Sequence, residues 1–368
     1  MNERGRTIKS PLWSNHGDIL LPCSGHKEKI TVLYENIMDK NILEETAKKM
    51  MAQPKGILAM DESSPTIAKR LSSINTENNE INRRRYRELI VTAPNLSSYI
   101  SGAILFEETF EQKMSDGTLF RDYLNSIGIL PGIKVDKGAK DFACHPNEKI
   151  TEGLDGLRER LAGYYANGAK FCKWRSVITI GQDIPSEACI ESNMNALARY
   201  ASLCQENNLV PIVEPEVLIN GSHTIEKCDT VTRKSLESLF KNLDMLNVYL
   251  PGTVLKPSMV ISGQDNSSRA DNNTVANMTV DCLSECVPET TSGIAFLSGG
   301  QSDTEAEEHL NIMNKKNNLP WRVTFSYARA IQAAALAAWQ GDDANLANAQ
   351  KILIDRASRC SKASMGEL

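Results

Sequence analysis

The chain has 368 residues, 41% of them hydrophobic and 24% charged, and a formal net charge of −5 at pH 7. These values are ordinary for globular proteins, so a wholly disordered chain is disfavoured. The sequence has no basic block and no basic stripe interleaved with aromatic residues, which disfavours nucleic-acid binding. No apolar run approaches the roughly 18 residues of a membrane-spanning helix. We therefore expect neither a nucleic-acid nor a membrane partner.

The first 28 residues are polar, rich in turn-forming residues and poor in acids, and they lack the apolar core of a secretory signal. We interpret them as an N-terminal extension. A remnant of an organelle transit peptide, and with it a plastid location, stays open as an alternative. Nine cysteines are scattered along the chain, and Cys172 lies inside an apolar run. This usage fits reduced thiols, so we expect a cytoplasmic protein.

Eight short apolar runs bounded by turn-forming residues follow in chain order, and each is expected to form a strand. They cover residues 56–61, 101–107, 131–136, 169–175, 209–216, 249–256, 293–300 and 322–328. Several are continuously apolar, as strands are when helices cover them.

Helical patterns lie between and around these runs. One covers residues 151–168, where Leu154, Leu157, Leu161 and Tyr165 recur at spacings of three and four. Further helices are expected at 34–52, 186–207, 274–286, 329–340 and 343–361, and the capping box from Ser302 to Glu305 begins another.

Eightfold alternation of strand and helix is typical of a closed parallel barrel. An open doubly wound sheet usually has fewer strands and would need a nucleotide-type glycine loop, and no G-x-G-x-x-G or G-x-x-x-x-G-K-[ST] occurs here. The expected fold is therefore α/β, a (β/α)8 TIM barrel. We assign the single barrel domain to residues 29–361, the extension to 1–28 and a short tail to 362–368.

Seven of the eight runs end in polar or charged residues. In chain order these are Asp61, then Lys134 and Asp136, Lys173 and Arg175, Glu214 and Glu216, Lys256, Ser298, and finally Ser326 and Arg329. Three of the pairs are spaced by two residues, which places both side chains on one side of a strand. Barrel enzymes build their active sites at the carboxyl ends of the strands, so we expect these residues to converge there.

Lys256 is the residue with the most specific chemical implication, because it ends the apolar segment YLPGTVLKPSM. Burying an isolated ammonium group is costly, so such a lysine is paired, functional or extended to solvent. In a low dielectric it loses its proton more easily, and the neutral amine can attack a carbonyl to form a Schiff base.

The other residue types in the sequence exclude some reaction classes and favour a phosphorylated substrate. None of the five histidines stands at a strand end, which disfavours catalytic zinc, and no G-x-S-x-G elbow is present. The segment Leu297–Ser302, with two glycines before the capping box, suits a phosphate, and Arg329 can add a bidentate fork. Barrel phosphate sites typically form after strands seven and eight, where this segment lies. Amine catalysis on a phosphorylated carbonyl compound is the expected reaction class, without metal or other cofactor.

These residues resemble class I fructose-1,6-bisphosphate aldolase, the metal-independent Schiff-base type. The matching motifs are GILAMDESSPTIAKRL, GIKVDKG, KFCKWR, VPIVEPE, TVLKPSM, FLSGGQS and TFSYARA, in order from about residue 30 to residue 360. The resemblance implies reversible cleavage of fructose 1,6-bisphosphate to dihydroxyacetone phosphate and glyceraldehyde 3-phosphate, in glycolysis, gluconeogenesis or carbon fixation. It also implies a homotetramer. Sedoheptulose bisphosphate or fructose 1-phosphate as substrate, and a non-enzymatic scaffold, are the alternatives.

The resemblance implies the following roles. Lys256 is the Schiff-base nucleophile, Glu214 the general acid/base, Lys173 a neighbouring cation that assists proton transfer, Asp61 the carboxylate near the C4 hydroxyl, and Glu216 a carboxylate that orients the lysines. Ser298, Gly299, Ala328 and Arg329 correspond to the C1-phosphate site. Ser63, Thr66 and Lys134 correspond to the C6-phosphate site, and Arg70 and Arg175 to its charged rim.

Three departures from the family's pattern are visible. Met60 replaces a small residue before the aspartate, and Ala328 replaces a glycine that offers its backbone N–H to phosphate. The printed chain ends in SKASMGEL, without the long tail and terminal tyrosine that animal members use for proton exchange at the enamine. Enamine protonation is therefore expected to limit turnover unless Glu214 takes over.

Overall fold

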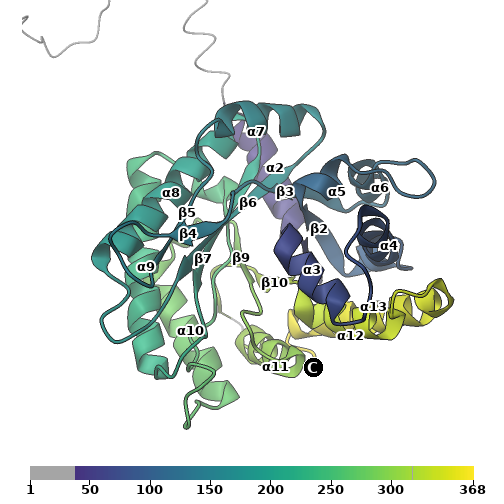
Figure 1. Cartoon of the computed structure of the whole chain (residues 1–368). Helices are drawn as coiled ribbons and strands as arrows, with labels where there is room; N and C mark the ends of the chain where they lie inside the picture. Colours follow the sequence, from purple (N-terminus) through teal and green to yellow (C-terminus); the bar gives the residue numbers. More distant parts are fainter. Residues whose placement is uncertain (1–37, 317) are drawn as a thin grey trace, which may run out of the picture. The chain divides into compact units, whose positions relative to one another are not determined.

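The computed structural model describes residues 38–316 and 318–368, and these form one barrel domain (Figure 1). The expected extension at 1–28 and residues 34–37 of the first expected helix lie outside the described residues. Eight parallel strands close into a barrel in the order β1-β10-β9-β8-β7-β6-β3-β2. The (β/α)8 prediction is confirmed. No helix of the described part is long and apolar enough to cross a membrane.

The barrel strands occupy the eight predicted places. They are β1 Gly56–Met60, β2 Ile100–Leu105, β3 Leu130–Lys134, β6 Phe171–Ile178, β7 Val210–Val217, β8 Val254–Leu255, β9 Gly293–Phe296 and β10 Val323–Tyr327. Prediction was wrong about the length of β8, which has two residues, because a short 3-10 turn at Leu250–Gly252 precedes it. Proline at position 251 fixes φ and lacks an N–H, which favours such a turn over a strand.

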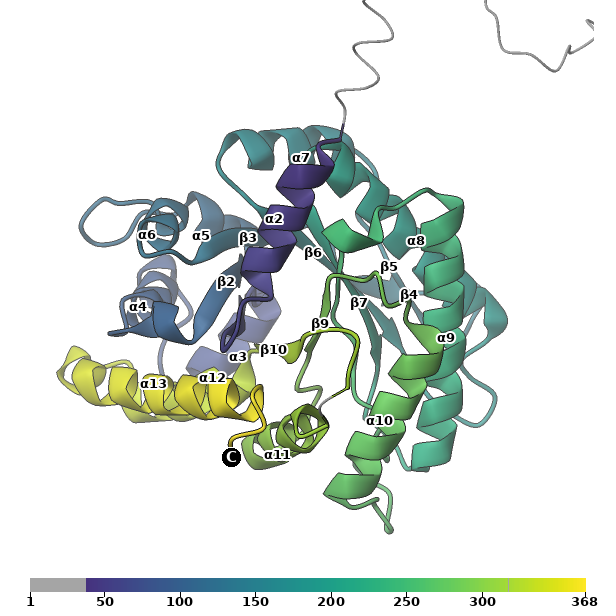
Figure 2. The ribbon, with the colours of Figure 1, turned by 180° about the vertical axis from the view of Figure 1, so that it is seen from behind.

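The helices surround the barrel (Figures 1 and 2). They are α2 Lys40–Met50, α3 Ser64–Ser72, α4 Glu80–Val91, α5 Glu107–Glu111, α6 Phe120–Ser126, α7 Leu157–Ala166, α8 Glu187–Glu206, α9 Ile225–Met245, α10 Asn272–Cys286, α11 Asp303–Asn314, α12 Arg329–Trp339 and α13 Leu346–Ala363. Helix α2 begins later than expected because Asp39 is its N-cap, accepting from the N–H groups of Asn41 and Ile42.

The helix expected at 151–168 also begins later. Residues Ala139–Asp141 and Lys149–Thr151 pair instead as a small antiparallel hairpin, β4 and β5, so α7 starts at Leu157. Its buried residues are Leu157, Leu161 and Tyr164, while Tyr165 is 39% exposed. The predicted apolar face was therefore wrong by one residue at its end.

Two apolar clusters hold the domain together. The larger one lies between the strands and the surrounding helices, and the smaller one fills the barrel with residues such as Ile57, Phe171 and Ile212. Leu43 and Met50 of α2 join the smaller cluster, so α2 closes the end of the barrel where the strands begin (Figure 2). Gly132 of β3 has a packing role, because a Cβ there would lie 2.2 Å from the Phe171 ring.

Candidate active site

The sequence-predicted residues converge at the opposite end of the barrel, around a cavity of about 260 Å³. Its lining includes every residue assigned above to catalysis or phosphate binding: Asp61, Ser63, Thr66, Arg70, Lys134, Lys173, Arg175, Glu214, Glu216, Lys256, Ser298, Gly299, Ala328 and Arg329. Asp61 and Lys256 come directly after β1 and β8, as expected for strand ends.

Four of the charged residues lie inside strands rather than at their ends. Strands β6 and β7 run further than predicted, and both continue past their charged pairs, Lys173 and Arg175 on β6 and Glu214 and Glu216 on β7. The register places Arg175 beside Glu214. These side chains therefore enter the barrel from its wall, whereas Asp61 and Lys256 reach it from its rim.

Glu214 stands between two lysines. Its Oε1 lies 3.1 Å from Lys256 Nζ, and its Oε2 lies 3.1 Å from Lys173 Nζ. Lys173 Nζ also lies 2.7 Å from Asp61 Oδ2. Lys256, Lys173 and Glu214 are each only 3% exposed, so two amines and two carboxylates form one largely buried network.

The network fixes the charge of its members. Burial, the largest influence, would raise the pKa of Asp61, but the ammonium groups of Lys173 and Lys256 outweigh it and lower that pKa to about 2. Burial acts in the same direction on Glu214, and the same two lysines hold its pKa below the usual value. Burial would lower the pKa of Lys173, but Asp61 and Glu214 raise it overall. Near neutral pH the site therefore holds two carboxylates and the ammonium of Lys173.

A second layer of charged groups surrounds this network. Lys134 Nζ lies 2.5 Å from Asp136 Oδ1 and also donates to the Asp136 carbonyl at 2.9 Å. Arg175 pairs with Glu216, and its backbone N–H donates to Asp136 Oδ2 at 3.3 Å. Glu216 contacts Arg175 and makes no ion pair with Lys173 or Lys256 among the described residues.

The predicted phosphate turn lies on the cavity wall. Gly299 and Gly300 have φ values of +47° and +87°, a left-handed conformation that favours glycine, and the Gln301 N–H donates to the Ser298 carbonyl at 2.9 Å. Both halves of the Ser302–Glu305 capping box are formed, and α11 follows, as predicted. Ala328 has a φ of −109°, which alanine adopts without the strain that a positive φ would bring.

The other predicted phosphate group lies at the start of α3. Ser63 and Thr66 hydroxyls are 3.1 Å apart, and Arg70 pairs with Glu62 and donates to Gln332 Oε1 at 2.9 Å. Sequence reasoning missed Glu62, although it follows Asp61 in the same motif and is 7% exposed. Its position eight residues before Arg70 was the available signal.

The cavity wall also holds a free hydroxyl. The Ser326 hydroxyl is buried there without a hydrogen-bond partner in the described part of the chain, so it is available to a ligand.

Over residues 38–316 and 318–368, no three histidine, cysteine, aspartate or glutamate side chains come together in a way that could hold a metal ion.

The family model described as "Fructose-bisphosphate aldolase class-I" matches residues 42–368. The chain belongs to the class I fructose-bisphosphate aldolase family. The resemblance inferred from the motifs is confirmed, and the protein is a lyase that cleaves fructose 1,6-bisphosphate. The non-enzymatic scaffold is not favoured.

Named relatives of this aldolase occur in bacteria and plants. The protein of Xanthomonas axonopodis pv. citri named "Probable fructose-bisphosphate aldolase class 1" is 56% identical over 326 residues, which cover 88% of this chain and 98% of the relative. The cytosolic fructose-bisphosphate aldolase 4 of Arabidopsis thaliana is 51% identical over 85% of this chain and 80% of its own length.

A solved structure supports the fold of this aldolase independently. Fructose-bisphosphate aldolase from Plasmodium falciparum, crystallised with TRAP and a small-molecule inhibitor, is 45% identical and superposes with a TM-score of 0.88. The match covers 90% of this chain and 96% of that one. The shared barrel therefore extends through almost all of both proteins.

Proposed function

We propose that Lys256 forms the Schiff base through which this aldolase cleaves fructose 1,6-bisphosphate to dihydroxyacetone phosphate and glyceraldehyde 3-phosphate. The observation that carries the proposal is the contact between Lys256 Nζ and Glu214 Oε1 at 3.1 Å in a buried site. A lysine amine acts as a nucleophile after it gives up its proton, and Glu214 is within hydrogen-bond reach to accept it.

The first half of the reaction builds the imine. The neutral Lys256 amine attacks C2 of the ketose and forms a C–N bond, giving a carbinolamine. Glu214, now protonated, returns its proton to the departing hydroxyl, which leaves as water. Lys173, whose charge Asp61 and Glu214 maintain, stabilises the developing anionic oxygen.

The second half breaks the C3–C4 bond. Asp61 takes the proton from the C4 hydroxyl, the C3–C4 electron pair moves toward the iminium nitrogen, and the aldehyde product leaves with an enamine behind. Protonation of the enamine at C3 and hydrolysis of the imine release dihydroxyacetone phosphate and restore Lys256. Asp61 stays ionised for this role because Lys173 and Lys256 outweigh its burial.

The phosphate groups of the substrate have separate binding groups in the same cavity. We assign the C1 phosphate to Ser298, Gly299, Ala328 and Arg329, and the C6 phosphate to Ser63, Thr66 and Lys134, with Arg70 and Arg175 on the rim. Glu216 orients the cationic groups through Arg175. The glycine turn and the adjacent helix ends supply backbone N–H groups, as phosphate sites in barrels do.

Borohydride reduction with dihydroxyacetone phosphate tests the proposal. The reagent should inactivate the enzyme and label Lys256, as located by peptide mapping. Lys256→Met keeps most of the side-chain volume and should lower the rate by at least about four orders of magnitude, because covalent catalysis is lost. Label found mainly on Lys173 or Lys134 would contradict the assignment.

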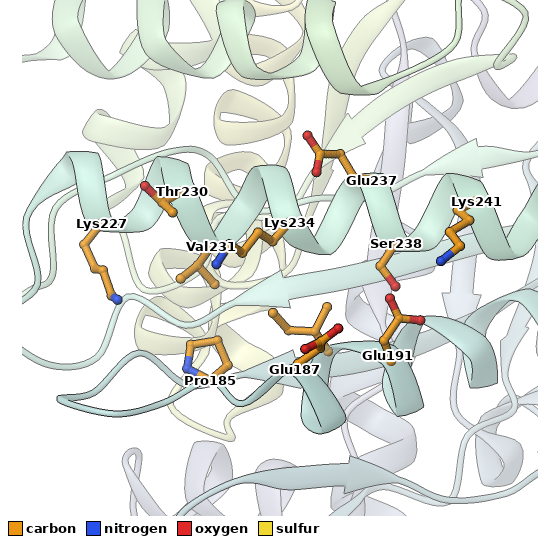
Figure 3. Close-up of a pocket in the computed structure, with 11 residues that line it drawn as sticks. Pro185, Glu187, Glu191, Lys227, Thr230, Val231, Lys234, Glu237, Ser238 and Lys241 are labelled. Atoms are coloured by element: carbon orange, nitrogen blue, oxygen red, sulfur yellow. The ribbon is translucent and has the colours of Figure 1, made fainter.

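We also propose that the enzyme is a homotetramer and that a groove between α8 and α9 is one of its contacts. The groove has a volume of about 500 Å³, and its floor includes Pro185, Ile190 and Val231. Figure 3 shows α9 along one side and α8 along the other. An apolar floor with charged edges is the usual composition of an interface between copies.

The charges around this groove support a second copy as the occupant. Lysines recur every seventh residue along α9, and glutamates line both helices: Lys227, Lys234 and Lys241, and Glu187, Glu191 and Glu237. None of these six makes an ion pair with another described residue. Contacts related by a twofold axis are self-complementary, so each copy can offer its lysines to the glutamates of the other.

Charge reversal tests this contact. Lys234→Glu should shift the assembly toward smaller species in analytical ultracentrifugation, and the same change at Lys48, which is exposed on α2, should not. A wild-type monomer would refute the tetramer. Equal assembly of the Lys234→Glu variant would place the contact elsewhere.

We further propose a cytoplasmic location, supported by the relatives named as cytosolic.

A further inference from the structure

His309 of α11 is a buried histidine that the reaction above does not use. It is 1% exposed, and its two ring nitrogens face side-chain amides from different loops. Nδ1 lies 2.7 Å from Gln301 Oε1, and Nε2 lies 2.9 Å from Asn272 Oδ1. Gln301 belongs to the phosphate turn after β9, and Asn272 is the first residue of α10, which follows the strand of Lys256.

The orientation of Asn272 fixes the tautomer of His309. The Asn272 amide nitrogen donates to the carboxylate of Glu308, which can only accept, so Oδ1 is the atom turned to the ring. His309 must therefore carry its proton on Nε2. Burial, opposed by Glu305 and aided by Arg269, lowers the pKa of His309 to about 4, so the ring is neutral near pH 7.

A neutral ring protonated on Nε2 accepts at Nδ1. Gln301 then satisfies Nδ1 with its amide nitrogen, after a half-turn about its last side-chain bond, whereas its Oε1 fits the protonated ring. Whether the His309 ring is neutral or protonated, its Nδ1 can therefore form a hydrogen bond with the Gln301 side chain. The Gln301 backbone N–H in turn donates to the Ser298 carbonyl and closes the turn that contains Gly299 and Gly300.

An ion pair makes a second connection between the same two loops. Arg269 lies 3.0 Å from Glu305, and Glu305 also accepts from the Ser302 N–H at 2.8 Å. Arg269 lies in the segment that connects Lys256 to α10, and Ser302 follows the phosphate turn. The segment after the proposed nucleophile and the segment after the proposed phosphate turn are therefore joined at two places.

We propose that His309 is a positioning residue that sets the Ser298–Gly300 turn relative to Lys256, and so determines the affinity for the substrate phosphate nearest the imine. The inference rests on the proposed function, which supplies the roles of Lys256 and the turn. His309 is not among the residues that line the cavity, and its hydrogen-bond partners are Gln301 and Asn272, which are not among them either. Its effect is consequently on phosphate affinity and not on the chemistry of the amine.

The test compares ligands with and without a phosphate. In wild type and His309→Ala, borohydride trapping is titrated with dihydroxyacetone phosphate and with dihydroxyacetone. We expect the half-saturating concentration to rise about tenfold for the phosphate ester and less than twofold for dihydroxyacetone, because one buried connection behind the turn is lost. Equal losses for both ligands, or no loss for either, would overturn the inference.

Matched variants separate positioning from folding. His309→Gln keeps a side chain that donates and accepts, and it should return the phosphate-ester value to within about threefold of wild type. Gln301→Ala removes the hydrogen bond between Gln301 and His309 at the half-buried residue of the pair. If His309→Ala folds poorly, Gln301→Ala should show the loss of phosphate-ester affinity in its place. His145→Ala is the control, because the His145 ring stacks on Phe142 in the β4–β5 hairpin. This substitution should leave the half-saturating concentrations of both ligands unchanged.

A direct binding measurement keeps the inference independent of the imine. Calorimetry with dihydroxyacetone phosphate in Lys256→Met, with and without His309→Ala, reports the affinity for the phosphate ester when Lys256 cannot form a Schiff base. A tenfold weakening there supports positioning by His309 even if borohydride labels another lysine. Unchanged affinity there refutes it even if Lys256 is labelled as proposed.

Discussion

The two ends of the barrel interior differ in composition: one is filled with apolar side chains and the other holds buried charged groups. Where the strands begin, α2 closes the interior with apolar side chains such as Leu43 and Met50. Where they end, the interior holds Asp61, Lys173, Glu214 and Lys256, which tolerate burial because each has an oppositely charged neighbour. Burial stabilises one end through removal of apolar surface from water, and at the other it sets protonation states. Mutations at the two ends should therefore separate stability from turnover.

The largest effect is expected at the charged end. Glu214→Gln removes the carboxylate between the two lysines and keeps the shape, and we expect the cleavage rate to fall by about a thousandfold because proton transfer to and from Lys256 is lost. Glu216→Gln is the matched control on the same face of β7, and it should lower the rate by about tenfold or less because, within the described residues, the ion-pair partner of Glu216 is Arg175 and neither lysine. Steady-state assays of both variants test this. Similar losses for the two would show that charge, and not position, matters.

At the apolar end, Gly132→Ala should affect stability and leave turnover almost unchanged. The new Cβ would lie 2.2 Å from the Phe171 ring, so strand or ring must shift, and overpacking of this kind costs about 1–3 kcal/mol. Gly163→Ala in α7 is the control, since a Cβ there meets nothing within 4 Å and alanine favours a helix by about 0.5–1 kcal/mol. Denaturant unfolding should move the two variants in opposite directions. A slowed cleavage step in folded Gly132→Ala would break the separation of the two ends.

The fold and most residues that line the cavity could be predicted from the sequence, because the strands and the polar residues near their ends follow a local pattern; Ser63, Thr66 and Arg70 came from the family resemblance, and Glu62 was missed. Each apolar run marked a strand, and the polar residues after or within it marked the cavity. The limits lay in properties that need tertiary contacts. No spacing rule shows that β6 continues past Arg175, because that continuation depends on pairing with β7, or that Asn272 meets His309, because the two are 37 residues apart in sequence. The late start of β8 was readable from Pro251, which lies in the turn before the strand, whereas the pairing of Glu62 with Arg70 was readable only in part.

A smaller effect is expected from acid, again at the charged end. The folded pKa of Asp61 is about 2, below the unfolded value of 3.8, so its ionised form favours folding above pH 3.8 and this stability is lost as the pH falls toward 2. Between pH 5 and pH 3 the loss from this one group is about 1 kcal/mol. Urea unfolding of wild type and Asp61→Asn at both pH values isolates it, because the variant lacks this titration. An equal drop in the free energy of unfolding of both proteins would show that the acid-induced loss of stability does not come from Asp61.

The smallest effect on turnover is expected from the last residues of the printed chain. Helix α13 ends at Ala363, and Arg322, just before β10, donates to the Ser364 carbonyl. The Ser364 hydroxyl contacts the Pro54 carbonyl, just before β1, at 3.4 Å, so this segment lies where the strands begin. Leu368 exchanges hydrogen bonds with Asn311, which donates from Nδ2 and accepts at Oδ1, at 3.1 and 3.0 Å.

Removing residues 365–368 should therefore cost about 1 kcal/mol of stability, the usual net value of one or two hydrogen bonds. Cleavage and tritium exchange at C3 of dihydroxyacetone phosphate should each stay within about threefold, because the lost contacts are at the end of the barrel away from Lys256. The comparison variant is Asn311→Ala, which removes the two hydrogen bonds with Leu368 without shortening the chain and should lose a similar stability. A tenfold loss of exchange on truncation alone would mean that these residues reach the enamine after all, and the separation of the two ends would fail at this point.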